Sequence, residues 1–249
     1  MTTTAAPWTL DAVRALAAEG AAAVGEDAGM DPDAYALRVE TARGALRWAA
    51  ETFGADLTVA SSMGDEVLVH LVGTTIPGTD VFFLDTGYHF AETLGTRDAY
   101  AAMLPIRMRT VLPLQTVAQQ DAKYGSKLHD RNPDQCCALR KVEPLERALS
   151  SHRAWVTGMR REDAPTRTDI AVVGVDERRG MVKLNPLAAW TAEDVARYTD
   201  ENNVFQNPLR QLGFASIGCA PCTRAVADGE DPRAGRWSGR AKTECGLHT

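Results

Sequence analysis

Short apolar runs alternate with longer amphipathic segments along the 249-residue chain, and this alternation limits the fold more than any other feature. The apolar runs have the length of buried strands and lie at 57–60, 81–84, 106–111 and 155–158, with a late extended segment at 182–187. Helical spacing or a capped apolar pattern marks the ranges 9–24, 34–53, 66–71, 90–102 and 191–203. Strands that alternate with helices predict an α/β fold with a mostly parallel sheet wrapped by helices.

The same pattern divides the chain into three parts. Residues 1–54 are expected to form N-terminal helices that pack on the core, and residues 55–227 the α/β domain itself. Residues 125–140 look loop-rich before a helix. Residues 228–249 are rich in Gly, Arg and Asp without apolar periodicity, so we expect a mobile C-terminal tail.

Two polar loops follow the first two predicted strands. Ser61 and Ser62 come after the first strand, and Asp85-Thr86-Gly87 after the second. Ligands of open α/β sheets bind at the carboxyl ends of the strands, and helix N-termini hold anions through backbone N–H groups. The first loop lacks the Gly-Lys-Ser/Thr of a Walker A loop. Its acids at 65 and 66 would repel an anion unless they point away, and plain turns are the alternative interpretation of both loops.

Four of the five cysteines form two pairs, Cys136-Cys137 and Cys219-x-x-Cys222. Four thiolates suit zinc or an iron–sulfur cluster. Adjacent cysteines are unusual in zinc sites, which prefer a spacer of two to four residues, so the pattern favours a cluster without deciding it. The alternative is a packing pair at 136 and 137 beside a redox pair at 219 and 222.

The fifth cysteine, Cys245, lies outside these pairs and close to the C-terminus. The preceding segment 233–242 carries four cations and no acid, namely Arg233, Arg236, Arg240 and Lys242. Nearby positive charge lowers the pKa of a thiol and raises its thiolate fraction. A nucleophile on a flexible arm is therefore one interpretation, and a spare surface cysteine is the other.

Further cations are candidates for anion binding. Guanidinium groups match sulfate and phosphate geometry, which makes Arg160, Arg161 and Arg167 candidate clamps, with Arg160 favoured over Arg161. Lys141 lies about one helical turn after Cys137, where a cation would sit between a metal centre and an anion. Solvated basic faces are the alternative for all four residues.

The overall charge excludes some partners. A net charge of −6 and a pI of about 5.4 argue against a broad nucleic-acid or anionic-membrane surface. No basic segment followed by an apolar run resembles a signal peptide, and no apolar stretch approaches the roughly 20 residues that span a bilayer. We therefore expect a cytoplasmic protein with reduced thiols.

Together the motifs carry a family resemblance from about residue 55 to the C-terminus. Cys136-Cys137 with Arg140-Lys141, Cys219-x-x-Cys222, and Glu244-Cys245-Gly246-Leu247-His248 closely resemble the assimilatory adenylyl-sulfate reductases, within the wider phosphoadenylyl-sulfate reductase family. The segments Ser61-Ser62, Leu84-Asp85-Thr86-Gly87, Thr157-Gly158-x-Arg160-Arg161 and Asn185-Pro186-Leu187 fit the same family.

The resemblance implies a fold like the adenine-nucleotide α-hydrolases, with nucleotide binding and the metal site both in residues 55–227. It implies a [4Fe–4S] cluster on Cys136, Cys137, Cys219 and Cys222, a nucleophilic Cys245, and adenosine 5′-phosphosulfate as substrate. It also implies a thioredoxin or glutaredoxin-like dithiol donor and a role in sulfate assimilation and cysteine biosynthesis. The implied substrate contacts are Ser61, Ser62, Asp85, Thr86, Gly87, Lys141, Gly158, Arg160, Arg161, Arg167, Arg236, Arg240 and His248.

Two other functions stay open at this point. One is a zinc-bearing nucleotide enzyme of the same fold, such as a phosphoadenylyl-sulfate reductase or an adenylating enzyme. The other is a cluster-bearing redox sensor without catalysis, for which the net charge offers no DNA-binding face. The oligomeric state is also open, with a homo-oligomer as one alternative.

Overall fold

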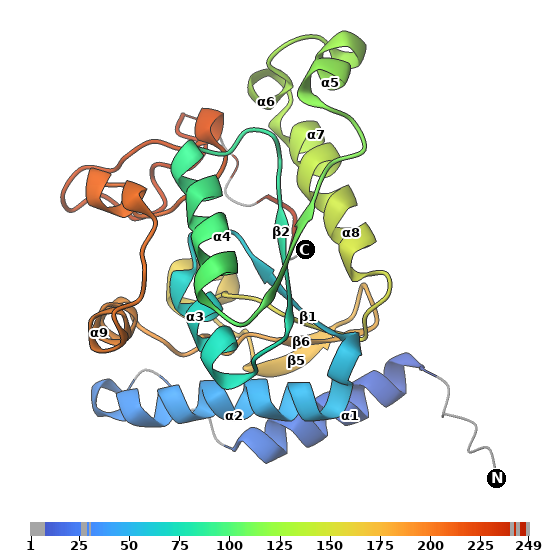
Figure 1. Cartoon of the computed structure of the whole chain (residues 1–249), viewed down its shortest axis with the longest axis vertical. Coiled ribbons are helices and arrows are strands. Elements are labelled where there is room, and N and C mark those ends of the chain that lie inside the picture. Colours follow the sequence, from blue (N-terminus) through green and yellow to red (C-terminus); the bar gives the residue numbers. More distant parts are fainter. Residues whose placement is uncertain (1–7, 26–28, 30, 240–241, 243–244, 248–249) are drawn as a thin grey trace.

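A six-stranded sheet forms the centre of the molecule in the computed structural model, which describes residues 8–25, 29, 31–239, 242 and 245–247 (Figure 1). Its strands run in the order β3-β2-β1-β4-β6-β5. All neighbours are parallel except β5 and β6, which are antiparallel. The strands are β1 (Leu57–Ser61), β2 (Asp80–Leu84), β3 (Arg107–Val111), β4 (Ala154–Val156), β5 (Val173–Asp176) and β6 (Met181–Leu184).

Helices cover both faces of this sheet, as predicted for an α/β fold (Figure 1). The α-helices are α1 (Leu10–Val24), α2 (Tyr35–Phe53), α3 (Glu66–Thr75), α4 (Ala91–Met103), α5 (Val117–Tyr124), α6 (Leu128–Arg131), α7 (Pro133–Cys137), α8 (Glu143–Leu149) and α9 (Ala192–Asn202). A π-helical segment, Ala138–Val142, joins α7 to α8. Short 3-10 turns lie at Pro32–Ala34, Gly54–Asp56, Arg161–Asp163, Pro165–Arg167, Pro208–Leu212 and Ala220–Cys222.

Alternation along the strands creates two different cores. Leu57, Val59 and Val156 point to one face and pack with the apolar sides of α1, α2 and α3. The N-terminal helices thus belong to the main core, because α1 packs on β5 and β6 and α2 packs on α3. Phe82 and Trp155 point to the opposite face and pack under α8.

A local sequence signal predicted the start of α9 correctly. The predicted N-cap of α9 is confirmed, because the Thr191 hydroxyl accepts a hydrogen bond from the Asp194 N–H and the Asp194 carboxylate accepts one from the Thr191 N–H. The strand β5 was not predicted, nor was α5. The late extended segment is a strand only over Met181–Leu184, after which turns follow.

The strand order places a topological switch point between β1 and β4. The chain moves outward from β1 through β2 to β3, and then returns to the other side of β1 to form β4. Loops after two such strands diverge and leave a crevice at their carboxyl ends. The loops that follow Ser61 and Val156 flank this point, so the predicted anion loop and the predicted Gly158-Arg160 segment lie at the expected edge.

Candidate active site

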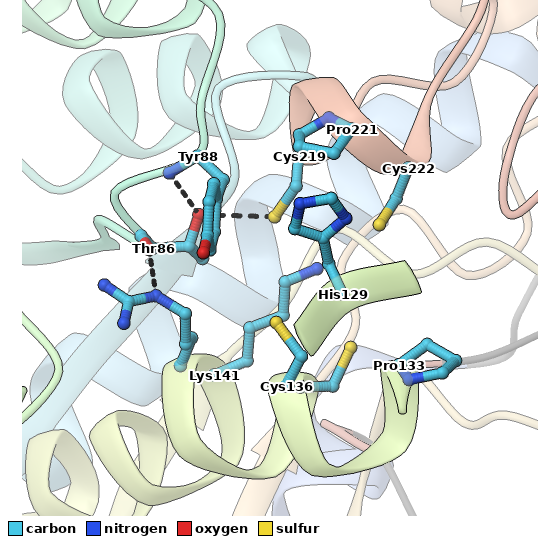
Figure 2. Close-up of a pocket in the computed structure, with 11 residues that line it drawn as sticks. Thr86, Tyr88, His129, Pro133, Cys136, Lys141, Cys219, Pro221 and Cys222 are labelled. Carbon is cyan, nitrogen blue, oxygen red and sulfur yellow. Dashed lines mark hydrogen bonds between the residues drawn. The ribbon is translucent and has the colours of Figure 1, made fainter. Parts of the chain in front are cut away.

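The four paired cysteines, which come from segments far apart in the sequence, line one hollow (Figure 2). Cys136 and Cys137 lie at the end of α7, and Cys219 and Cys222 flank the 3-10 turn Ala220–Cys222. The hollow is also lined by Thr86, Tyr88, His129, Pro133, Arg140, Lys141 and Pro221. The prediction that the two pairs belong to one site is therefore supported by their position.

The loop after β2 joins this hollow to the sheet. Thr86 is buried, and its hydroxyl lies 3.2 Å from the Sγ of Cys219. The Ala220 N–H donates to the Tyr88 carbonyl at 2.7 Å, which anchors the C-x-x-C turn to the same loop. The predicted substrate loop is thus also a wall of the cysteine hollow.

Arg140, which the sequence analysis quoted only as part of a motif, is buried and holds this wall in place. Its Nε donates to the Thr86 carbonyl, and its Nη1 donates to the Gln120 Oε1 at 3.1 Å. Its guanidinium also lies 5.3 Å from the ring centre of Tyr88. Arg140 and Lys141 lie in the π-helical segment, a rare conformation that often marks functional sites.

The four thiols influence one another electrostatically. Burial, together with negative charge on Cys137, Cys219 and Cys222, raises the pKa of Cys136 to about 12. Such a set of thiols binds metal as thiolates, because coordination replaces the proton.

Their spacing bears on which metal group would fit. Among the described residues, no three His, Cys, Asp or Glu side chains lie close enough to share a single metal ion. A zinc ion would need each sulfur about 2.3 Å from one point. The four thiols line one hollow, and a donor set of this kind suits zinc or an iron–sulfur cluster.

Lys141 is half-buried beside the thiols, and in Figure 2 its side chain points towards the cysteine pairs. Burial alone would lower its pKa, but the thiolates of Cys219, Cys245 and Cys137 outweigh burial and raise it. Lys141 therefore stays charged at neutral pH. This position agrees with the prediction of a cation next to the cysteine site.

Arg236 approaches the same place from the C-terminal segment. Its Nη1 donates to the Ser216 hydroxyl at 3.2 Å and to the Ile217 carbonyl at 3.3 Å. A side chain at Gly218 would collide with the Arg236 guanidinium, so this glycine makes room for Arg236. Burial lowers the pKa of Arg236, and the thiolate of Cys245 opposes that effect.

The described part of the tail lies against the body of the protein. Cys245 is half-buried and close enough to Cys137, Lys141 and Arg236 to interact electrostatically. Leu247 packs on the cluster around Trp155, and its carbonyl accepts a hydrogen bond from Arg179 at 3.4 Å. Mobility of the tail stays a prediction, and Arg240 and His248 lie outside the described residues.

In the loop between β1 and α3, the two predicted serines donate hydrogen bonds to an acid of the same loop. The Asp65 Oδ1 accepts hydrogen bonds from the Ser61 hydroxyl at 2.6 Å and from the Ser62 N–H at 3.3 Å. Burial raises the pKa of Asp65 to about 6. Glu66 points away from the loop, where it accepts hydrogen bonds from Asn207 and Arg210. A role for Ser61 and Ser62 in anion binding stays a prediction.

Glycines on the two flanking loops allow close packing. A Cβ at Gly158 would lie 2.9 Å from the Asp65 Oδ2, so the loops after β1 and β4 meet here. Gly87 has a φ of 72°, and its N–H donates to the Asp85 Oδ1 at 2.9 Å.

Two of the three arginines predicted to bind the anion form ion pairs with the same acid. Arg160 and Arg167 share Asp163, with nitrogen–oxygen distances of 2.7 and 3.3 Å. Arg161 points elsewhere and donates to the Ile170 carbonyl at 3.0 Å. The geometry therefore separates Arg161 from the other two. Anion binding by all three stays a prediction.

Trp237 is the main site residue that the sequence analysis missed. It is 3% exposed, and its N–H donates to the Cys222 carbonyl at 3.0 Å. The signal was present, because a lone tryptophan interrupts the basic run at 233–242. His129 and Tyr88, whose rings lie 5.2 Å apart, gave no comparable signal because they are separated in sequence.

Known proteins agree with this architecture. Residues 56–225 match the phosphoadenosine phosphosulfate reductase domain. The chain is 58% identical over 227 residues to the adenosine 5′-phosphosulfate reductase of Streptomyces coelicolor, covering 91% of this chain and 94% of the relative. A crystal structure of phosphoadenylyl-sulfate reductase from Candida auris, in a phosphate complex, has a TM-score of 0.62 and 29% identity, covering 81% of this chain and all of that one.

A more distant likeness concerns the fold alone. FMN adenylyltransferase of Candida glabrata, solved with FAD and pyrophosphate, has a TM-score of 0.53 at 12% identity, covering 86% of this chain and 74% of that one. Fold and site thus define an α/β protein of the adenine-nucleotide α-hydrolase type with a cysteine-lined site. The chain belongs to the phosphoadenosine phosphosulfate reductase family, which confirms the resemblance drawn from its motifs.

Proposed function

We propose that this chain is an assimilatory adenylyl-sulfate reductase, which reduces the sulfate of adenosine 5′-phosphosulfate to sulfite. The observation that carries the proposal is the position of Cys245 beside the cysteine hollow, next to Lys141 and Arg236. A thiol held between cations is suited to accept a sulfo group. The name of the Streptomyces relative, at 58% identity, supports the same substrate.

The proposed first step is a displacement at sulfur. The Cys245 thiolate attacks the sulfate sulfur, an S–S bond forms, and the S–O bond to the phosphate breaks. AMP leaves with the electron pair, so no general acid is needed. Lys141 and Arg236 neutralise charge on the sulfo oxygens, and Arg160 and Arg167 are the predicted partners of the phosphate.

The second step releases sulfite and requires two electrons. A thiolate of a thioredoxin or glutaredoxin-like donor attacks the Cys245 sulfur, and sulfite departs with the electron pair of the S–S bond. The donor's second thiol then resolves the mixed disulfide and restores Cys245. Partial exposure of Cys245 is compatible with such an exchange.

We further propose that Cys136, Cys137, Cys219 and Cys222 hold a [4Fe–4S] cluster. Their convergence on one hollow supports a shared metal group, and the adjacency of Cys136 and Cys137, which is unusual in zinc sites, favours a cluster over zinc. When bound, the cluster supplies a crosslink between α7 and the 218–222 segment, and a local charge that complements Lys141. The bonds made and broken in the two steps above lie between Cys245, the substrate and the donor.

The setting of the reaction follows from its chemistry. No helix in the described part of the chain is long and apolar enough to cross a membrane. We place the protein in the cytoplasm, where a dithiol donor stays reduced. Sulfite formed there would feed cysteine biosynthesis, in keeping with an assimilatory role.

The test compares two substrates on protein of measured iron content. Sulfite release is assayed with adenosine 5′-phosphosulfate and with its 3′-phosphorylated form, each with a dithiol donor. We expect turnover of the unphosphorylated substrate and at most weak turnover of the other. Preference for the 3′-phosphorylated form would favour the activity named for the Candida auris relative, and no sulfite from either would refute the proposal.

A further inference from the structure

Trp237 collects three cations around a single indole ring. The guanidinium of Arg236 lies 4.6 Å from the ring centre, the Nζ of Lys242 lies 5.7 Å from it, and the Nζ of Lys141 lies 6.0 Å from it. All three distances are within the range in which a ring face attracts a cation, and tryptophan is the strongest aromatic partner.

The backbone of Trp237 has an unusual conformation that contacts with neighbouring segments hold in place. Its φ of 47° lies in the left-handed region, which bulky side chains rarely adopt. The conformation is held on one side by the hydrogen bond from its N–H to the Cys222 carbonyl. On the other side, Arg236 pairs with Thr223 in an isolated antiparallel bridge.

Of the three cations around the ring, only Lys242 pairs with a carboxylate among the described residues. Lys242 pairs with Asp134, whose side chain is otherwise exposed. Lys141 has no carboxylate partner among the described residues. The Nε of Arg236 is buried and has no hydrogen-bond partner within the described part of the chain. Cations without a carboxylate partner favour an external anion at the same place.

Cys245 lies at this place, because both Lys141 and Arg236 interact with its thiol. We propose that Trp237 is a positioning residue, whose indole ring holds Lys141, Arg236 and Lys242 around Cys245 so that they face the sulfo group of the substrate. The inference rests on the function proposed above and adds the residue that organises the sulfo-binding cations.

The test separates binding of the sulfo group from binding of the nucleotide. In a Cys245→Ser background, which blocks turnover, affinities are measured for adenosine 5′-phosphosulfate and for AMP, which lacks the sulfo group. Trp237→Leu removes the ring face and Trp237→Phe keeps a weaker one. Trp48→Phe in α2, a tryptophan outside the cysteine hollow, is the matched control.

We expect Trp237→Leu to weaken adenosine 5′-phosphosulfate binding about tenfold and AMP binding less than twofold, with Trp237→Phe in between. Equal losses for both nucleotides, or none, would overturn the inference. Iron content is measured on each variant. If Trp237→Leu loses iron, the test rests on iron-replete Trp237→Phe instead. A selective loss of adenosine 5′-phosphosulfate binding in that variant supports the inference, and unchanged binding refutes it.

The two proposals fail in different ways. If the Cys245→Ser parent binds neither nucleotide, the proposed function itself fails. If the parent prefers adenosine 5′-phosphosulfate to AMP and Trp237→Leu keeps that preference, only the role of Trp237 fails.

Discussion

The paired cysteines and Cys245 are the same side chain in two different settings. Cys136, Cys137 and Cys219 are buried; the first two lie in α7, and Cys219 directly precedes the turn at 220–222. Cys245 is half-buried, the described residues 245–247 form no helix or strand, and Leu247 packs against the body of the protein.

This difference assigns the two kinds of thiol to different tasks. Thiols fixed on regular elements can hold a metal group whose geometry must not change. A thiol outside helices and strands can react at one place and meet a partner at another. The surroundings, and not the residue type, therefore separate the proposed ligands from the proposed nucleophile.

The most direct way to break this comparison is Cys245→Ser. A serine hydroxyl is a far weaker nucleophile, so we expect sulfite formation to fall by at least about 10³-fold. Iron content and AMP binding should match the unsubstituted protein, since Cys245 lies outside the paired cysteines. Retained turnover, or loss of iron, would show that Cys245 is not a separate nucleophile.

The converse change is Cys219→Ser in the buried set. We expect loss of the bound iron and a fall in the free energy of unfolding of about 2–5 kcal/mol, because a crosslink between distant segments is removed. Iron analysis and thermal unfolding measure both effects, with Cys245→Ser as the control for loss of one thiol. A stable variant with full iron content would contradict the assignment.

A milder change sharpens the role of the tail attachment. Leu247→Ala removes a partly buried side chain from the cluster around Trp155 and should weaken docking by about 1 kcal/mol. We expect about fivefold slower turnover with unchanged iron. Leu37→Ala, on an exposed position of α2, is the matched control and should change neither. Unchanged turnover in Leu247→Ala would mean that this contact does not place Cys245.

The smallest expected effect concerns Asp65, in the loop that follows β1 at the carboxyl end of the sheet. The pKa of Asp65 is raised to about 6 in the folded protein, above its ordinary value of 3.8, so the folded state binds this proton more tightly than the unfolded state. Its contribution to the free energy of unfolding therefore falls as pH rises from about 4 to 6.

Asp65→Asn should remove this pH dependence and stabilise the protein at pH 7 by about 1 kcal/mol. The single oxygen Oδ1 accepts both hydrogen bonds from Ser61 and Ser62, and an asparagine keeps an oxygen there. Urea unfolding at pH 4.5 and pH 7 measures the effect. An identical pH dependence in both proteins would show that Asp65 is not the group responsible.

Most of the sheet was predictable because its signals are local. Buried strands such as Leu57–Ser61 and Asp80–Leu84 contain short, mainly apolar runs, and α9 begins at a capping box. The strand Val173–Asp176 escaped prediction because it contains Gly174 and Asp176 and depends on antiparallel pairing with β6. Its pairing depends on tertiary contacts and cannot be inferred from its own residues.

The candidate site divides in the same way. The cysteine pattern identified the four paired thiols and the separate Cys245, because each motif is contiguous in the sequence. Arg140 and Trp237 could not be assigned from the sequence. Their roles depend on contacts with Thr86 and with Cys222, which are 54 and 15 residues away along the chain.

The sequence by itself determined the α/β class, the number and grouping of thiols, and the loops that follow β1 and β2, because these depend on neighbours within a few residues. Only the tertiary structure decided that Thr86 contacts Cys219, that Asp163 joins Arg160 to Arg167, and that Trp237 gathers three cations. Interactions among charges and thiols depend on the distances between them, and the distance between residues remote in sequence is set by how the sheet and helices pack.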